Sequence, residues 1–265
     1  MKAFLILEDG HVFTGTSIGS QREVISEIVF NTSMTGYLEV LTDPSYAGQA
    51  VTMTYPLIGN YGICYEDMES DRPWPDGYIV RELSRIPSNF RSVDTIQNFL
   101  EKYDIPGIAG IDTRALTKIL RESGTMNGMI TTKEYTSLDE VIPRLKAYTT
   151  GKVVEKVTCR ERKVLENDGL RVALLDLGAK RNIARSLHSR GCQVTIYPAG
   201  TSAEEIIADR PDGIMLSNGP GDPKECGPII EEIRKLYHTD IPIFAICLGH
   251  QLMALATGAD TYKLK

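Results

Sequence analysis

The second half of the chain alternates short apolar runs with amphipathic segments, and this order restricts the fold more than any other feature. Strands that alternate with helices through short turns predict βαβ units and a parallel sheet with helices on both faces. Ligands of such sheets bind beyond the carboxyl ends of the strands. We expect strands at 171–175, 193–197, 213–216 and 241–246, and helices at 181–189, 203–208, 227–237 and 251–257.

The first half predicts a mixed α/β domain. Its expected strands are rich in β-branched residues and are separated by turn residues, at 3–7, 24–31 and 49–54. Helical spacing is found at 92–100 and 138–147. A further helix is predicted to begin after Asp112 as N-cap and to end at Gly124.

A change in composition divides the 265 residues into two domains of ordinary size. Residues 149–168 form a charged stretch interrupted by valines, without a clear period, which we interpret as a connection. The predicted organisation is therefore an N-terminal domain at 1–148, a linker at 149–168 and a second α/β domain at 169–265.

Charge and cysteine content exclude several classes of protein. The net charge is −6 and no block of Lys and Arg occurs, so a nucleic-acid or anionic-membrane surface is not expected. No apolar stretch approaches the roughly 20 residues of a membrane span, and the first ten residues are too polar for a secretory signal. The five cysteines are far apart and form no CxxC pair, which argues against a disulfide framework and a metal site. A cytoplasmic location is expected.

One cysteine follows a predicted strand directly. The strand at 241–246 runs into Cys247 and then into a helix, which predicts a sharp strand-to-helix turn of the nucleophile-elbow kind. The positive end of a helix dipole favours a thiolate at this place. The alternative is a buried core cysteine, the commoner fate of a lone thiol.

A second strand end carries the segment 217–223 (SNGPGDP). Glycines at 219 and 221 let backbone N–H groups approach a ligand closely, which suits an oxyanion. A plain surface turn is an equal alternative for this segment alone. Because it lies one βα unit before Cys247, however, the two loops are predicted to lie at the same edge of the sheet.

These residues resemble a known family. Segments 217–223 and 244–251 (FAICLGHQ) resemble class I glutamine amidotransferases. The resemblance narrows to the small subunit of carbamoyl phosphate synthetase through five further segments and covers the whole chain. They are 30–37 (FNTSMTGY), 41–49 (LTDPSYAGQ), 55–62 (YPLIGNYG), 110–117 (GIDTRALT) and 176–183 (DLGAKRNI).

The resemblance implies hydrolysis of L-glutamine to glutamate and ammonia, with Cys247 as nucleophile and a glutamyl thioester as intermediate. It implies backbone N–H groups of Leu248 and Gly219 as the oxyanion hole. The resemblance implies that the main-chain groups of the substrate are held by Ser45, Gly221 and Gln251. Without the resemblance, the sequence favours a turn residue as the role of Ser45. Ammonia is expected to pass to a large synthetase subunit, which binds ATP and magnesium. No cofactor is expected on this chain.

The chain departs from the family pattern beyond Cys247. The resemblance implies a histidine and a glutamate downstream of the nucleophile, and these are absent from residues 1–265, so we expect a truncated chain with an exposed apolar sheet edge. Among its four histidines, His250 is near Cys247 but is expected to pack or hydrogen-bond rather than to act as a base. Two hypotheses follow: a glutaminase component that is complete only with its C-terminal segment, or a non-catalytic module that binds the large subunit.

Overall fold

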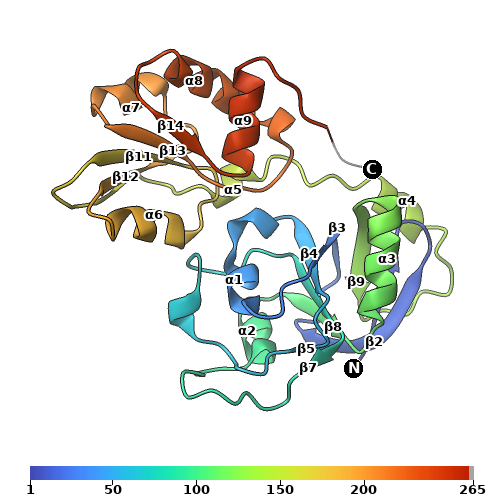
Figure 1. The fold of residues 1–265 in the computed structure, drawn as a ribbon. Coiled ribbons are helices and arrows are strands. Elements are labelled where there is room, and N and C mark those ends of the chain that lie inside the picture. The colour runs from blue at the N-terminus through green and yellow to red at the C-terminus, as the bar shows by residue number, and fades with distance from the viewer. Residues whose placement is uncertain (263–265) are drawn as a thin grey trace. The chain divides into compact units, whose positions relative to one another are not determined.

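The computed structural model describes residues 1–262 (Figure 1). They form two compact units. The first comprises residues 1–42 and 48–150, and the second comprises residues 43–47 together with the described residues from 151 on. The segment 43–47 thus belongs to the second unit, although the chain on either side of it belongs to the first. No helix of the described part is long and apolar enough to cross a membrane.

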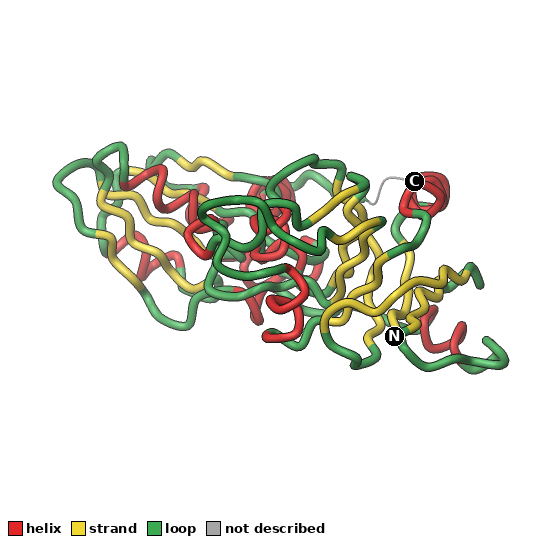
Figure 2. Tube along the Cα trace, turned by 90° about the horizontal axis from the view of Figure 1, so that it is seen from below, coloured by secondary structure: helices red, strands yellow, loops and turns green. Residues whose placement is uncertain are grey.

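The first unit is built on a closed seven-stranded barrel, whose strands lie near the label N in Figure 2. The strand order is β1-β2-β8-β6-β4-β3-β9. The neighbours β8, β6, β4 and β3 pair in parallel, and the other pairs of the barrel are antiparallel. The strands are β1 (Lys2–Leu7), β2 (Val12–Gly19), β3 (Val24–Asn31), β4 (Gln49–Met53), β6 (Gly77–Val80), β8 (Pro106–Ala109) and β9 (Met126–Thr131).

Helices cover the barrel because its strands present apolar side chains on both faces. In β1, Leu5 and Leu7 belong to the core that also contains Leu116 and Leu120 of α3 (Thr113–Ser123). Ile6, the residue between them, packs in a second cluster with residues of α4 (Val141–Lys146). The unit also contains α1 (Tyr37–Thr42), α2 (Ile96–Lys102) and the small sheet of β5 (Leu57–Ile58) and β7 (Glu82–Leu83).

The second unit contains a five-stranded sheet in the order β10-β12-β11-β13-β14. Strands β12, β11, β13 and β14 run in parallel, and β10 pairs with β12 in the antiparallel sense. β14 is the last strand of the described order, and Phe244 within it is 67% exposed. The strands are β10 (Lys163–Leu165), β11 (Arg171–Asp176), β12 (Gln193–Pro198), β13 (Gly213–Leu216) and β14 (Ile243–Ala245).

Two apolar clusters cover the two faces of this sheet, as the alternation of side chains along a strand requires. Leu175 of β11 packs with α7 (Ala203–Ala208), α8 (Gly227–Tyr237) and α9 (Leu248–Ala256). Its neighbour Leu174 packs on the opposite face with α6 (Arg181–His188). Figure 1 shows α6 apart from α7, α8 and α9, with the strands between them.

The predicted elements lie close to observed ones, but several elements of the first unit, among them β2, β6, β8 and β9, were not predicted. Three predicted segments also differ from the structure. The helix expected at 92–100 begins at Ile96, because Thr95 is its N-cap and accepts a hydrogen bond from the N–H of Asn98. The segment 149–168, expected to be a connection, contains α5 (Val154–Val157) and β10. The helix expected at 251–257 begins at Leu248, directly after Cys247.

Candidate functional site

Cys247 lies in the short turn between a strand and a helix. β14 ends at Ala245 and α9 begins at Leu248, so the chain turns within two residues. Cys247 has φ 50° and ψ −113°, a backbone conformation that residues other than glycine rarely adopt. This conformation strains the turn. The residue is exposed. The thiol is therefore accessible at a helix N-terminus rather than packed in the core.

The turn is fixed by contacts of α9 with the end of β13. The N–H of Gly249 donates to the carbonyl oxygen of Ser217 at 3.0 Å, and the N–H of Ile246 donates to that of Leu216 at 3.0 Å. A Cβ on Gly249 would lie 2.7 Å from three atoms: the Cβ of Leu216 and the carbonyl oxygens of Leu216 and Ser217. Glycine at position 249 thus allows the first turn of α9 to lie directly against the backbone that leads into the 217–223 loop.

The peptide between Asn218 and Gly219 is held in one orientation. The Ser217 hydroxyl accepts from the N–H of Leu177 at 2.9 Å and donates to the carbonyl oxygen of Asn218 at 2.7 Å. Because C=O and N–H point in opposite directions across a trans peptide, the N–H of Gly219 points away from Ser217. A Cβ on Gly219 would lie 2.2 Å from Leu177 O and 2.8 Å from Leu248 Cδ2. This loop therefore packs closely against the first residue of α9.

The other residues singled out from the sequence near this loop have different exposures. Leu248 is 1% exposed, and as the first residue of α9 its N–H has no acceptor within the helix. Gly221 is exposed and has φ +87°, which favours glycine. Gln251 is exposed, and its N–H donates to the carbonyl oxygen of Cys247 at 3.0 Å.

Ser45 is linked to the same loop by a side-chain hydrogen bond. The Nδ2 of Asn218 donates to Ser45 Oγ at 2.8 Å. Asp43 is the N-cap of the short 3-10 helix that contains Ser45, and its Oδ1 accepts from the N–H of Ser45 at 2.9 Å. The Nζ of Lys180 lies 2.9 Å from Asp43 Oδ2, and the Asp43 side chain is 7% exposed. These contacts all lie within the second unit, which includes residues 43–47.

The turn after β11 completes the group of strand ends. Asp176 is 8% exposed, and its carboxylate accepts from the N–H groups of Gly178 at 2.9 Å, Ala179 at 2.7 Å and Cys159 at 2.7 Å. Three such bonds satisfy a buried carboxylate and fix the turn. The turns after β11, β13 and β14 lie together at the carboxyl edge of the sheet, because the N–H groups of Leu177 and Gly249 both donate to Ser217.

The histidines are distributed away from Cys247, with one exception. His11 Nδ1 contacts Asp9 at 2.8 Å in the first unit. His188 Nε2 contacts the carbonyl oxygen of Glu166 at 3.0 Å, and the ring of His238 lies edge-on to that of Tyr237. His250 lies on α9 and is exposed, so it does not pack, which was one of the two roles, packing or hydrogen bonding, that the sequence predicted for it.

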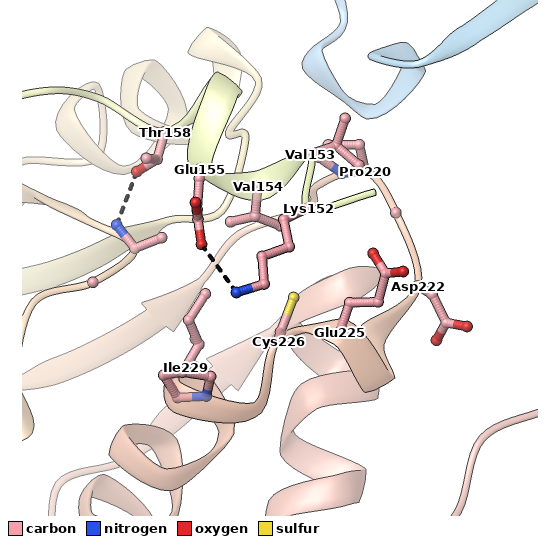
Figure 3. A pocket seen from close by; sticks show the side chains of 14 residues that line it. Lys152, Val153, Val154, Glu155, Thr158, Pro220, Asp222, Glu225, Cys226 and Ile229 are labelled. Atoms are coloured by element: carbon pink, nitrogen blue, oxygen red, sulfur yellow. Dashed lines mark hydrogen bonds and ion pairs between the residues drawn. The ribbon is translucent and has the colours of Figure 1, made fainter. Parts of the chain in front are cut away.

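A cavity of about 240 Å³ lies beside the loop, lined in part by Val153, Gly221 and Cys226, and it does not include Cys247 (Figure 3). Cys226 is 8% exposed. Burial, with smaller contributions from nearby carboxylates, raises its pKa to about 11. Burial and the neighbouring Asp176 likewise raise the pKa of Cys159 to about 12. Neither thiol is prepared for nucleophilic attack at neutral pH.

Sequence reasoning singled out Ser45 but not the side chain that contacts it. Asn218 was noted as part of the loop and given no role, and the orienting hydroxyl of Ser217 was not recognised. Ser45 and Asn218 are 173 residues apart, so no local spacing could have joined them. Among the described residues, no group of three His, Cys, Asp or Glu side chains could hold a metal ion.

Comparisons with known proteins identify two families along the chain. Residues 5–130 match the model of the carbamoyl-phosphate synthase small chain, CPSase domain, and residues 173–265 match that of class I glutamine amidotransferases. The carbamoyl phosphate synthase small chain of Listeria monocytogenes is 50% identical over all 265 residues, which cover 72% of that protein. Those of Clostridium perfringens and Oceanobacillus iheyensis are 50% and 52% identical over the same length, covering 75% and 72% of those proteins.

Proposed function

This chain belongs to the family of carbamoyl phosphate synthase small chains, and from that premise we propose that it is the component that hydrolyses glutamine through a cysteine thioester and supplies ammonia to the large synthetase chain. The observation that carries the proposal is the exposed Cys247 in its strained backbone conformation at the start of α9. A thiol in such an elbow is accessible to substrate and lies at the positive end of a helix dipole.

The proposed reaction begins when the Cys247 thiolate attacks the side-chain amide carbon of L-glutamine and forms a C–S bond. The negative oxygen of the tetrahedral intermediate accepts hydrogen bonds from the N–H groups of Leu248 and Gly219. The amide nitrogen takes up the proton that the thiol lost, and collapse of the intermediate then breaks the C–N bond, releases ammonia and leaves a glutamyl thioester. Water then cleaves the thioester, which yields glutamate and restores the thiol.

Support for the oxyanion hole comes from how its two peptides are held. The Ser217 hydroxyl orients the peptide that carries the N–H of Gly219, and the packing of Gly219 on Leu248 brings the two donors' residues into contact. Donors that are oriented in advance stabilise developing charge without a cost of reorganisation. Ser45, Gly221 and Gln251 are proposed to hold the main-chain groups of the substrate.

The proposed partner is the large chain of carbamoyl phosphate synthase, which the family name implies. ATP and magnesium are assigned to that chain, and none to this one, because neither a P-loop nor a GxGxxG motif occurs in the sequence. A cytoplasmic location stays a prediction from the sequence. The proton acceptor for the thiol is assigned to none of the four histidines.

The test measures the thiol separately from turnover. Residues 1–265, extended by the part of the Listeria monocytogenes small chain that they do not cover, are incubated with L-glutamine, with and without the large chain, and released ammonia and glutamate are quantified. Hydroxylamine added in parallel intercepts a glutamyl thioester as γ-glutamyl hydroxamate. We expect the hydroxamate from the unaltered chain and from Cys64→Ser, whose thiol lies in the first unit, and none from Cys247→Ser.

The same experiment addresses the alternative of a non-catalytic interaction module. If the chain binds the large chain while hydroxamate and ammonia are at background in both the unaltered protein and Cys247→Ser, the interaction module is the correct function. Hydroxamate that persists in Cys247→Ser would also refute the proposal, because another group would then be the nucleophile.

A further inference from the structure

Asn218 makes an unusually complete set of contacts for a loop side chain. It follows β13, is 4% exposed, and its Nδ2 donates to Ser45 Oγ at 2.8 Å and to the carbonyl oxygen of Gly178 at 3.0 Å. Its Oδ1 accepts from the N–H of Lys180 at 3.1 Å. Nδ2 also lies 3.4 Å from Asp43 Oδ1. One buried amide thus joins three segments of the second unit.

The chemistry of these partners fixes which way the amide faces. A backbone carbonyl such as that of Gly178 can only accept, and a backbone N–H such as that of Lys180 can only donate. Rotating the amide by 180° would place oxygen against oxygen at Gly178 and nitrogen against N–H at Lys180. Nδ2 must therefore be the atom that faces Ser45.

This orientation determines the role open to the Ser45 hydroxyl. Because Oγ accepts from Asn218 Nδ2, its own hydrogen points elsewhere and can donate to a further acceptor. Of the two main-chain groups of free glutamine, the carboxylate accepts hydrogen bonds and the ammonium does not. Asn218 also precedes Gly219 directly, so the same residue is part of the peptide that carries a proposed oxyanion donor.

We propose that Asn218 is a positioning residue for substrate binding, whose amide holds Ser45 beside the Gly219 loop and sets the Ser45 hydroxyl as a donor toward the α-carboxylate of glutamine. This inference rests on the proposed glutaminase function. It does not make Asn218 a catalytic residue, since its side chain acts through Ser45.

The test uses a chloroketone analogue of L-glutamine that retains the α-amino and α-carboxylate groups. The Cys247 thiolate displaces chloride and forms a C–S bond, so covalent labelling followed by intact mass spectrometry gives an inactivation rate and a concentration for half-saturation without turnover. Asn218→Ala is expected to raise the half-saturating concentration about ten-fold, the effect of losing one well-placed hydrogen bond. Asn167→Ala, which removes a partly buried amide bonded to the carbonyl oxygen of His188, is the matched control and is expected to leave it unchanged.

Two further measurements separate positioning from a general structural effect. Ser45→Ala combined with Asn218→Ala is expected to bind the analogue no more weakly than the weaker single variant, because the two residues act through one contact. Labelling of Cys247 by iodoacetamide, which needs no substrate contact, is expected to stay within two-fold of the unaltered chain. Asn218→Asp, which keeps the size but removes the donor, is expected to weaken binding similarly and provides the test should Asn218→Ala fail to fold.

The outcomes distinguish this inference from the function on which it rests. If the analogue fails to label Cys247 in the unaltered chain, or if L-glutamine gives no protection, the proposed function is wrong whatever Asn218 does. If the unaltered chain is labelled and protected, but both Asn218 variants bind the analogue equally well, the positioning role alone is refuted. Strictly additive effects of the Ser45 and Asn218 substitutions would refute it too.

Discussion

Replacing Gly249 by alanine should displace the first turn of α9 and with it the proposed nucleophile. The added Cβ would lie 2.7 Å from three atoms of Leu216 and Ser217, whereas ordinary contacts begin at 3.4 Å. Relief requires the helix to move by the difference of these two distances, about 0.7 Å. The hydrogen bond from Gly249 N–H to Ser217 O would lengthen from 3.0 Å to about 3.7 Å, beyond a useful length.

These changes set the expected loss of stability. Overpacking costs roughly 1–3 kcal/mol, and the lost hydrogen bond roughly 0.5–1.5 kcal/mol. The better helix propensity of alanine offsets roughly 1 kcal/mol, which leaves a net loss of about 0.5–3.5 kcal/mol. For a unit of this size the midpoint of unfolding should fall by roughly 2–14 °C. Because small misplacements of reacting groups are costly, labelling of Cys247 by the glutamine chloroketone should slow at least ten-fold.

Differential scanning calorimetry measures this change, and the chain supplies its own internal reference. The single tryptophan, Trp74, lies in the first unit, so the transition seen by tryptophan fluorescence should not move. Gly227→Ala is the matched control, because no atom lies within 4 Å of its added Cβ and it begins α8. The reasoning would be refuted if the Gly249→Ala chain had the same midpoint temperature as the Gly227→Ala chain and its Cys247 were labelled at the same rate.

Three further predictions concern thiols, acid stability and a helix cap. Iodoacetamide at pH 8 should label the exposed Cys247 well before Cys226. Labelling of Cys226 should rise steadily toward pH 11, as its thiol ionises. Mass spectrometry of peptides measures both, and labelling of Cys226 before Cys247 would contradict the assignment of burial. Burial alone would raise the pKa of Glu23, but hydrogen bonds from three side chains outweigh it and lower the pKa. The ionised carboxylate therefore adds to the free energy of unfolding above about pH 4.5, and this contribution is lost as the pH falls. Glu23→Gln should therefore cost up to about 1 kcal/mol in urea unfolding at pH 7, since the group is partly screened by solvent, and the cost should shrink as the pH is lowered. Asp112→Ala should cost about 1 kcal/mol at pH 7, because the carboxylate accepts from the N–H of Ala115 at 3.0 Å, and an unchanged urea midpoint would contradict this.

Local patterns in the sequence determined most helices and strands of the second unit, although α5 and β10 were not predicted. The predicted segments 203–208, 213–216 and 227–237 coincide with α7, β13 and α8. The predicted N-cap Asp112 and stop at Gly124 are confirmed by a side-chain hydrogen bond and by φ 84° at the glycine. Periodicity and capping act within a few residues, so the sequence displays them directly.

The closing of the barrel could not be predicted in this way. The strands of the first unit were recognised in part, but their order places β8 between β2 and β6, far from its neighbours in sequence. Such pairing depends on which partners bury a strand on both of its faces, and no local pattern encodes the partner. The short runs Leu57–Ile58 and Glu82–Leu83 also pair only because the fold brings them together.

The candidate site also has features that the sequence predicts and features that depend on the tertiary structure. The sequence by itself determined that a cysteine lies where a strand gives way to a helix, one βα unit after a glycine-bearing loop, because both features are contiguous in the chain. Only the tertiary structure decided that residues 43–47 join the second unit and that Ser45 bonds to Asn218. The physical reason is that a hydrogen bond across 173 residues forms through the packing of whole elements, whose energy is spread over the core and leaves no local pattern at either end.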